Sequence, residues 1–220
     1  MGRPDMPPLH RDGLDPDPIA QFGEWYERAE ADLPLADAMT LATVDPDDLP
    51  DGRMVLLKGF DARGFRFFTN SNSAKGNQLE AGSEAALVIY WRELDRQVRI
   101  RGAVEVVGEA EADEYFASRP RDSQIGAWAS PQSEALDGRE WLDARMRELE
   151  GRFEGGDVPR PPHWNGYRVR PREIEFWQGQ KGRLHDRFRY VREGVETEGS
   201  TEGVFRGDDG IGWRIERLAP

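Results

Sequence analysis

The chain has 220 residues, of which 37% are hydrophobic and 33% charged, and its formal net charge is -12. This length suits one domain, and the acidic balance disfavours general binding to nucleic acid or anionic membranes, whose phosphates it would repel. The absence of cysteine excludes disulfides and a thiolate nucleophile, and three histidines argue against a histidine metal centre.

The N-terminal segment, residues 1–16, is rich in Pro and Asp, which predicts a mobile arm before a single domain over residues 17–220. No apolar run approaches the roughly 20 residues of a membrane span, and no signal-peptide core is present, so we expect a cytoplasmic location. Asp17 and Pro18 then suit the start of a helix. Its apolar residues recur at helical spacing and are expected in the core: Ile19, Phe22, Trp25, Tyr26 and Ala29.

Alternating apolar residues and turn signals predict a run of strands after this helix. Ser73 suits the N-cap of a short helix that ends at Leu79. Because the strands are joined by short connections, they favour an antiparallel barrel or sandwich over a parallel α/β sheet. The expected strands are Met39–Val44, Arg53–Lys58, Phe65–Thr69, Glu84–Trp91 and Arg96–Val107.

The second half of the chain predicts helices and then a return to strands. Helices are expected over Glu109–Ser118, from a cap at Asp122 or Ser123 to Trp128, and over Gly138–Phe153. The last of these is expected to pack over one end of the barrel. An acidic, Gly-rich loop is expected over Glu193–Gly210, and the strands are Tyr167–Trp177, Arg183–Arg192 and Gly212–Leu218.

The strand predicted from Arg183 carries an unusual charge pattern. Period-two alternation places Leu184, Phe188 and Tyr190 on one face, where Asp186 would need a polar partner. A cationic face is a poor candidate for a core, so it indicates an anion, a polar aromatic ligand or, equally, solvent. The residues of that face are Arg183, His185, Arg187 and Arg189.

Two helix starts have the composition of an anion site, because N-terminal N–H groups and the helix dipole favour negative charge. The first combines Thr69 and Ser73 with Lys75, and the second places Arg119 and Ser123 near Tyr115. A plain helix cap is the competing interpretation of each. Two further features are weaker. Arg53 and Lys58 would point to opposite faces of one predicted strand, and Gln132-Ser133 lies in a polar stretch. Together these features indicate two phosphorylated aromatic ligands or one large one.

Several motifs in this order resemble the pyridoxamine 5'-phosphate oxidase family, from about the first helix to the last residue. They are Arg53–Lys58, Arg96–Val98, Tyr115–Trp128, Gln132-Ser133, Glu175–Gly179, Arg183–Arg187 and Arg217–Pro220. The resemblance implies a mainly β fold with peripheral helices, an antiparallel FMN-binding split β-barrel that forms a homodimer with flavin at the subunit interface. It also implies oxidation of pyridoxamine or pyridoxine 5'-phosphate to pyridoxal 5'-phosphate, with O2 reduced to H2O2 and no metal.

The resemblance implies a role for individual residues as well. Arg183 and His185 are the expected catalytic groups over the pyridine ring of the substrate. The expected clamp on the substrate phosphate is Lys58, Tyr115, Arg119 and Ser123. The expected FMN-binding residues are Arg53, Lys58, Phe68, Thr69, Lys75, Gln97, Gln132, Ser133, Trp177 and Arg187.

The chain departs from the family pattern in several places; among them, Ala74 stands where an Arg is usual, and Phe68 replaces a Tyr. Two alternatives also stay open. One is a sister flavin oxidase of the same barrel that acts on a larger aromatic such as a phenazine precursor, and the other is a flavin-binding protein without catalysis. The predicted clamp on the substrate phosphate favours a pyridoxamine 5'-phosphate oxidase over the sister oxidase.

Overall fold

The computed structural model describes residues 6–193, 204–206 and 212–220. Within these residues, ten strands form one antiparallel sheet in the order β2-β1-β5-β6-β7-β8-β10-β9, and β3 and β4 join it because β4 pairs with β7. The strands are β1 (Ala38–Val44), β2 (Pro50–Leu56), β3 (Gly59–Asp61), β4 (Gly64–Asn70), β5 (Glu84–Trp91), β6 (Arg96–Val106), β7 (Trp164–Gln178), β8 (Asp186–Arg192), β9 (Val204–Arg206) and β10 (Gly212–Arg217).

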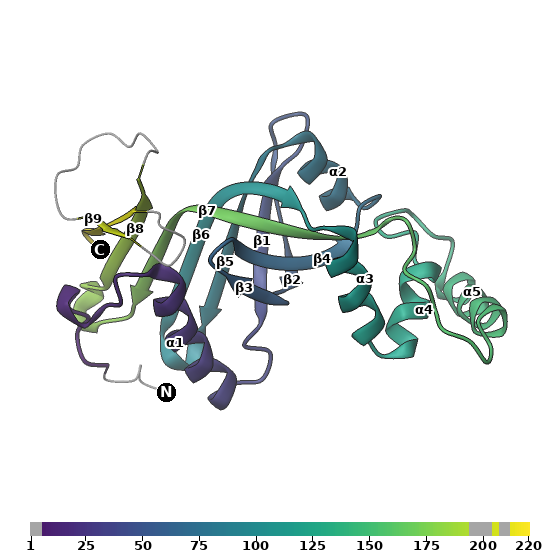
Figure 1. The fold of residues 1–220 in the computed structure, drawn as a ribbon, viewed down its shortest axis with the longest axis horizontal. Helices are drawn as coiled ribbons and strands as arrows, with labels where there is room; N and C mark the ends of the chain where they lie inside the picture. The colour runs from purple at the N-terminus through teal and green to yellow at the C-terminus, as the bar shows by residue number, and fades with distance from the viewer. Residues whose placement is uncertain (1–5, 194–203, 207–211) are drawn as a thin grey trace.

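The long strand β7 is where the barrel splits (Figure 1). One edge of β7 pairs with β6, while the other pairs first with β4 and then with β8. At the change of partner, β6 carries a bulge between Arg101 and Gly102. A Cβ at Gly102 would lie 1.9 Å from the carbonyl oxygen of Arg170, so this close approach requires glycine.

Helix α1 (Pro18–Asp32) fills the core of the barrel, as its apolar stripe predicts. The Asp17 carboxylate caps it by accepting a hydrogen bond from the Ile19 N–H at 2.8 Å. Phe22 and Trp25 are buried, and the Trp25 ring meets Phe176 edge to face at 5.2 Å. Each such buried ring stabilises the fold by roughly 1.5–3 kcal/mol.

The remaining helices are α2 (Ala74–Ala81), α3 (Glu109–Ser118), α4 (Arg121–Ala129) and α5 (Arg139–Arg152). The expectation that α5 packs over the barrel is wrong: α4 and α5 lie beyond the end of the sheet (Figure 1) and form a small second core. The physical reason is that α5 buries only Leu149 while Trp141 stays 47% exposed, too narrow a stripe to cover a barrel end. α4 starts at Arg121 without the predicted side-chain cap.

The predicted strand from Arg183 begins three residues later, at Asp186. Gly182 and Arg183 adopt positive φ values of 68° and 64°, and this left-handed pair turns the chain before the strand starts. The expected alternation is therefore wrong for Leu184, which is 71% exposed. It is confirmed for the rest of the strand, where Phe188 and Tyr190 are buried.

Asp186 is 2% exposed on the apolar side of β8 and finds the partners that its burial requires. Its carboxylate accepts hydrogen bonds from the Leu9 N–H at 2.9 Å, from Gln180 Nε2 at 2.9 Å and from Arg217 Nη2 at 2.5 Å. From residue 6 the predicted arm thus lies against the C-terminal half of the sheet, and Leu14 is buried there. The boundary between arm and domain at residue 16 stays a prediction.

Most of the acidic loop predicted over residues 193–210 lies outside the described residues, apart from β9. Among the residues that the structure does describe, no helix combines the length and apolarity that a membrane crossing requires. No group of acidic or histidine side chains in those same residues has the arrangement of a metal site.

Candidate active site

A cavity of about 460 Å³ lies where β2, the end of β4, α2 and the junction of α3 with α4 meet. It collects side chains that are far apart in the sequence, and it is lined on one side by apolar β2 residues. Eight of the residues predicted to bind FMN or the substrate phosphate line it. These are Lys58, Phe68, Thr69, Lys75, Tyr115, Arg119, Ser123 and Gln132.

Lys75, the second residue of α2, forms one cationic wall of this cavity. Ser73 caps α2 through its Oγ, which accepts from the Gly76 N–H at 3.3 Å. The Lys75 Nζ donates to Gln132 Oε1 at 2.9 Å, and Thr69 Oγ1 donates to the same oxygen at 3.2 Å. Burial, with the nearby positive charge of Arg53, lowers the pKa of Lys75. A bound anion would reverse this effect.

Arg53 and Ser133 flank this wall without lining the cavity. Arg53, on β2, donates to Thr43 Oγ1 at 2.5 Å and to Gln78 Oε1 at 2.7 Å, and also pairs with Asp51. Ser133 adopts a φ of 77°, a left-handed conformation that is uncommon outside glycine and is typical of functional loops. Arg53 is close enough for its charge to act on Lys75, and Ser133 directly follows the cavity residue Gln132 in the chain.

Arg119 forms the other cationic wall, at the end of α3. Its guanidinium carbon lies 4.9 Å from the ring centroid of Trp164 and 5.5 Å from that of Phe116. Its Nη1 atom is buried without a hydrogen-bond partner, and within the described part of the chain the side chain has no carboxylate neighbour that pairs with it. Burial lowers the pKa of Arg119. A partly buried cation without a counter-ion favours the binding of an anion, because an unpaired charge is costly to bury.

Lys58, Tyr115 and Phe68 complete this end of the cavity. Lys58 follows β2 rather than lying in it, so strand parity does not separate it from Arg53 as the sequence predicts. Its Nζ donates to Asp37 at 2.7 Å. The rings of Tyr115 and Phe68 stack at 4.2 Å and give the cavity a flat aromatic wall.

The other predicted site residues form a second cluster, outside this cavity. Gln97, Trp177 and Arg187 are register partners across β6, β7 and β8, so they lie in one row. The His185 ring lies 4.7 Å from the Trp177 ring, and Arg183 is exposed in the turn before it. Arg187 donates to the buried Glu175 at 2.8 Å, and this hydrogen bond raises the pKa of Arg187.

The two clusters lie near opposite ends of β7. Trp164 begins this strand at the cavity, and Trp177 lies next to its last residue. Thirteen residues of strand span roughly 43 Å at about 3.3 Å each, although the curl of the sheet shortens the direct path. Figure 1 shows the end of β7 near β8, far from α3. Within one subunit, therefore, the clusters cannot contact one small ligand.

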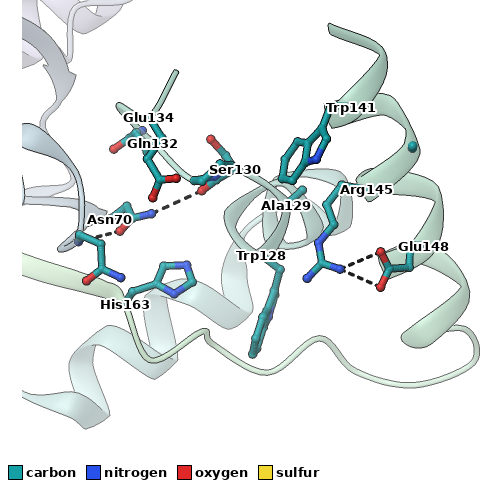
Figure 2. Close-up of a pocket in the computed structure, with 13 residues that line it drawn as sticks. Asn70, Trp128, Ala129, Ser130, Gln132, Glu134, Trp141, Arg145, Glu148 and His163 are labelled. Atoms are coloured by element: carbon teal, nitrogen blue, oxygen red, sulfur yellow. Dashed lines mark hydrogen bonds and ion pairs between the residues drawn. The ribbon is translucent and has the colours of Figure 1, made fainter. Parts of the chain in front are cut away.

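A second cavity, of about 510 Å³, adjoins the first and shares Gln132 with it. Figure 2 shows it between the loop at Ser130 and α5, with Trp141 and Arg145 on the α5 side. Arg145 is paired with Glu148 at 2.7 Å, so its charge is already compensated. This cavity therefore offers less uncompensated positive charge than the one beside Arg119.

Trp164 is the main site residue that sequence reasoning missed. It lines the first cavity and is 6% exposed, and its ring stacks on Phe68 at 5.1 Å with an interplanar angle of 9°. The available signal was its position two residues after Pro162, the last proline of a Pro-rich stretch, and immediately before Asn165-Gly166, but a tryptophan there is more simply a core residue.

Comparison with known families decides the relationship of the chain. Residues 26–153 match the family described as pyridoxamine 5'-phosphate oxidase, and residues 164–220 match the pyridoxine 5'-phosphate oxidase C-terminal dimerisation region. The chain belongs to the pyridoxamine 5'-phosphate oxidase family. The predicted family and split-barrel fold are thereby confirmed, and all of the second cluster except Gln97 lies within the dimerisation region.

Individual relatives agree with this family. The chain is 54% identical over 213 residues to a pyridoxine/pyridoxamine 5'-phosphate oxidase of Rubrobacter xylanophilus, covering 96% of this chain and 91% of that one. It is 57% identical over 205 residues to the Azorhizobium caulinodans oxidase of the same name, with coverage of 93% and 90%. The crystal structure of PhzG from Burkholderia lata 383, in complex with tetrahydrophenazine-1-carboxylic acid, is 32% identical, with a TM-score of 0.86 and full coverage of both chains.

Proposed function

We propose that this protein is an FMN-dependent oxidase that converts pyridoxamine 5'-phosphate and pyridoxine 5'-phosphate into pyridoxal 5'-phosphate. The amine reaction consumes O2 and water and releases NH3 and H2O2, and the alcohol reaction consumes O2 and releases H2O2. The observation that carries the proposal is the half-buried Arg119, whose buried Nη1 has no hydrogen-bond partner among the described residues, in a cavity with one flat aromatic wall. A phosphorylated aromatic substrate supplies both of the groups that this cavity needs.

The substrate phosphate is proposed to bind between Arg119, Lys58, Tyr115 and Ser123. Charge-assisted hydrogen bonds to a phosphate are roughly twice as strong as neutral ones, and here they would form in a partly desolvated site. Because the phosphate is remote from the reacting carbon, this binding energy can orient that carbon without taking part in the chemistry.

The residues around Lys75 fit the phosphate of FMN. Lys75 and Arg53 are two neighbouring cations, and Thr69, Gln132 and Ser133 add polar atoms beside them. Burial, followed by the nearby charge of Arg53, lowers the pKa of Lys75, and a bound phosphate would favour its charged form. When bound, FMN supplies the redox chemistry by accepting two electrons from the substrate and passing them to O2.

We further propose a homodimer in which the second cluster of one subunit completes the cavity of the other. The separation of the clusters along β7 and the match of residues 164–220 to a dimerisation region support this arrangement. Gln97, Trp177 and Arg187 would then contact FMN, while Arg183 and His185 would contact the substrate ring.

The hydrogen bonding of His185 defines its part in the reaction. The Gln180 N–H donates to His185 Nδ1 at 3.1 Å, so Nδ1 acts as an acceptor and the neutral ring carries its hydrogen on Nε2. His185 therefore offers a hydrogen-bond donor to the substrate ring and does not begin the reaction as a base through Nε2. Arg183, exposed at the turn, would add positive charge on the same side.

The sister oxidase and the flavin-binding protein without catalysis remain the competing functions. A phenazine-type substrate has no phosphate and would leave Arg119 without its anion, and the oxidases named for pyridoxine and pyridoxamine phosphate are the more similar relatives. The test is to supply FMN-loaded protein with pyridoxamine 5'-phosphate in air and to measure pyridoxal 5'-phosphate and H2O2. Equal amounts of the two products support the oxidase, and the absence of both contradicts it.

A complementation experiment tests the shared site. Arg119→Ala and His185→Ala lie in different clusters, so a mixed dimer of these two variants keeps one intact cavity. At a substrate concentration well below KM, where each variant alone has little activity, random reassortment should restore about a quarter of the wild-type sites, because half of the dimers are mixed and each holds one good site. If the mixture stays inactive while mixed dimers are present, the clusters do not belong to one shared site.

A further inference from the structure

Trp164 connects the phosphate end of the cavity to the helix that carries Arg119. It is the first residue of β7, and its carbonyl oxygen accepts a hydrogen bond from Arg160 Nη1 at 2.9 Å. The Nε of Arg160 donates to Asp113 of α3 at 2.5 Å. The backbone of Trp164 is thus fixed relative to α3, and its ring is fixed by stacking on Phe68.

The ring of Trp164 is the surface on which the Arg119 guanidinium rests. The distance of 4.9 Å is within the range of a cation–π interaction, for which Trp is the strongest partner. Phe116 lies on the guanidinium as well, at 5.5 Å. The described residues provide no hydrogen bond to Nη1, and the contacts observed for the guanidinium are with these two aromatic rings.

The other cations near the cavity are held differently. Lys58 is paired with Asp37 at 2.7 Å, and Lys75 donates to the neutral oxygen of Gln132. A carboxylate that held Arg119 would compete with an incoming phosphate for the same N–H groups. An aromatic face attracts the cation through its quadrupole and leaves those N–H groups available.

We propose that Trp164 is a positioning residue that holds Arg119 ready for the substrate phosphate and so makes the enzyme select phosphorylated substrates. This inference rests on the proposed function, since it assigns the phosphate to Arg119. Trp164 need not contact the reacting atoms. Its loss should weaken the binding of phosphate and of phosphorylated substrates while leaving turnover of bound substrate nearly unchanged.

The test compares Trp164→Leu and Trp164→Phe with wild type, using FMN-loaded protein and pyridoxine 5'-phosphate as substrate. KM and the inhibition constant of inorganic phosphate should both rise about tenfold in Trp164→Leu and about threefold in Trp164→Phe, which keeps a weaker aromatic face. kcat should change much less than KM. Trp141→Leu is the matched control, because Trp141 is an exposed tryptophan on α5, and it should leave both constants at their wild-type values.

A double-mutant cycle separates positioning from a general loss of structure. In an Arg119→Ala background, Trp164→Phe should have no further effect on KM or on inhibition by phosphate, since the residue on which it acts is gone. A full additional effect in that background would overturn the proposal, as would an unchanged inhibition constant in Trp164→Leu. Absence of turnover in wild-type protein would instead contradict the proposed function, and phosphate binding measured by calorimetry would still test Trp164 in that case.

Discussion

Replacement of Arg119 by Ala tests the proposed phosphate site directly. The guanidinium contacts aromatic rings and forms no hydrogen bond with the described residues, so its removal leaves no protein group unpaired. The cost should therefore appear in substrate binding. Loss of a hydrogen bond to a charged group costs about 2 kcal/mol, which corresponds to a roughly 30-fold rise in KM for pyridoxine 5'-phosphate.

Folding stability should change far less than substrate binding. Burial disfavours the charged form of Arg119, which is why its pKa is lowered, so the variant loses ring contacts but is also relieved of a desolvated charge. We expect the midpoint of thermal unfolding without ligand to stay close to that of wild type. FMN affinity should also be retained, since Lys75 and Arg53 are unchanged.

The assay is steady-state formation of pyridoxal 5'-phosphate, with an FMN titration and a melting curve for each variant. Arg121→Ala is a matched control, because Arg121 lies two residues further on and donates to the carbonyl oxygens of Gly156 and Phe153, outside the cavity. An unchanged KM in Arg119→Ala, or an equal rise in Arg121→Ala, would refute the assignment of the substrate phosphate to Arg119.

Three further predictions concern the groups that hold the site in place. Asp186→Asn removes a buried charge that accepts three hydrogen bonds, and chemical denaturation should show a loss of about 2 kcal/mol of unfolding free energy; an unchanged midpoint would mean that the arm is not anchored there. Gly166→Ala places a Cβ 2.6 Å from the Phe68 ring, so KM for pyridoxine 5'-phosphate should rise several-fold, whereas an unaltered KM would show that this wall yields freely. Burial raises the pKa of Glu111, but hydrogen bonds from two arginines of the sheet outweigh this effect and lower the pKa below its ordinary 4.5. The stabilising contribution of Glu111 is thus present above that pH and is lost as pH falls through the lower folded-state pKa. Glu111→Gln should therefore be less stable than wild type at neutral pH and lose less stability than wild type on acidification. Parallel pH profiles of unfolding free energy for the two proteins would contradict this.

Much of the fold follows from local patterns in the sequence. The N-cap at Asp17 and the apolar stripe after it predict α1, and alternation predicts β5 and β6 with their bounds nearly unchanged. These elements are predictable because burial of one face fixes their period. The start of β8 is missed because Arg183 adopts a left-handed conformation, which residues other than glycine rarely do and which the sequence does not mark.

The site is only partly accessible to the same reasoning. Ser73 and Lys75 carry a local signal, because a helix start favours anions and its composition can be read directly. Trp164 carries none, since its role depends on the distance to Arg119, 45 residues away in the chain, and that distance exists only in the fold. The separation of Trp177 from the cavity is also invisible in a sequence, where the family motifs read as one continuous site.

The central claim is that Arg119 binds the phosphate of a vitamin B6 compound that FMN oxidises. One measurement tests this claim most directly. FMN-loaded protein is mixed anaerobically with pyridoxamine 5'-phosphate, and the visible flavin absorption is followed before and after O2 is admitted. The account predicts that the absorption bleaches, that O2 restores it, and that pyridoxamine without its phosphate is far less effective at the same concentration. Flavin absorption that persists with pyridoxamine 5'-phosphate, or that bleaches equally with the unphosphorylated amine, would contradict it.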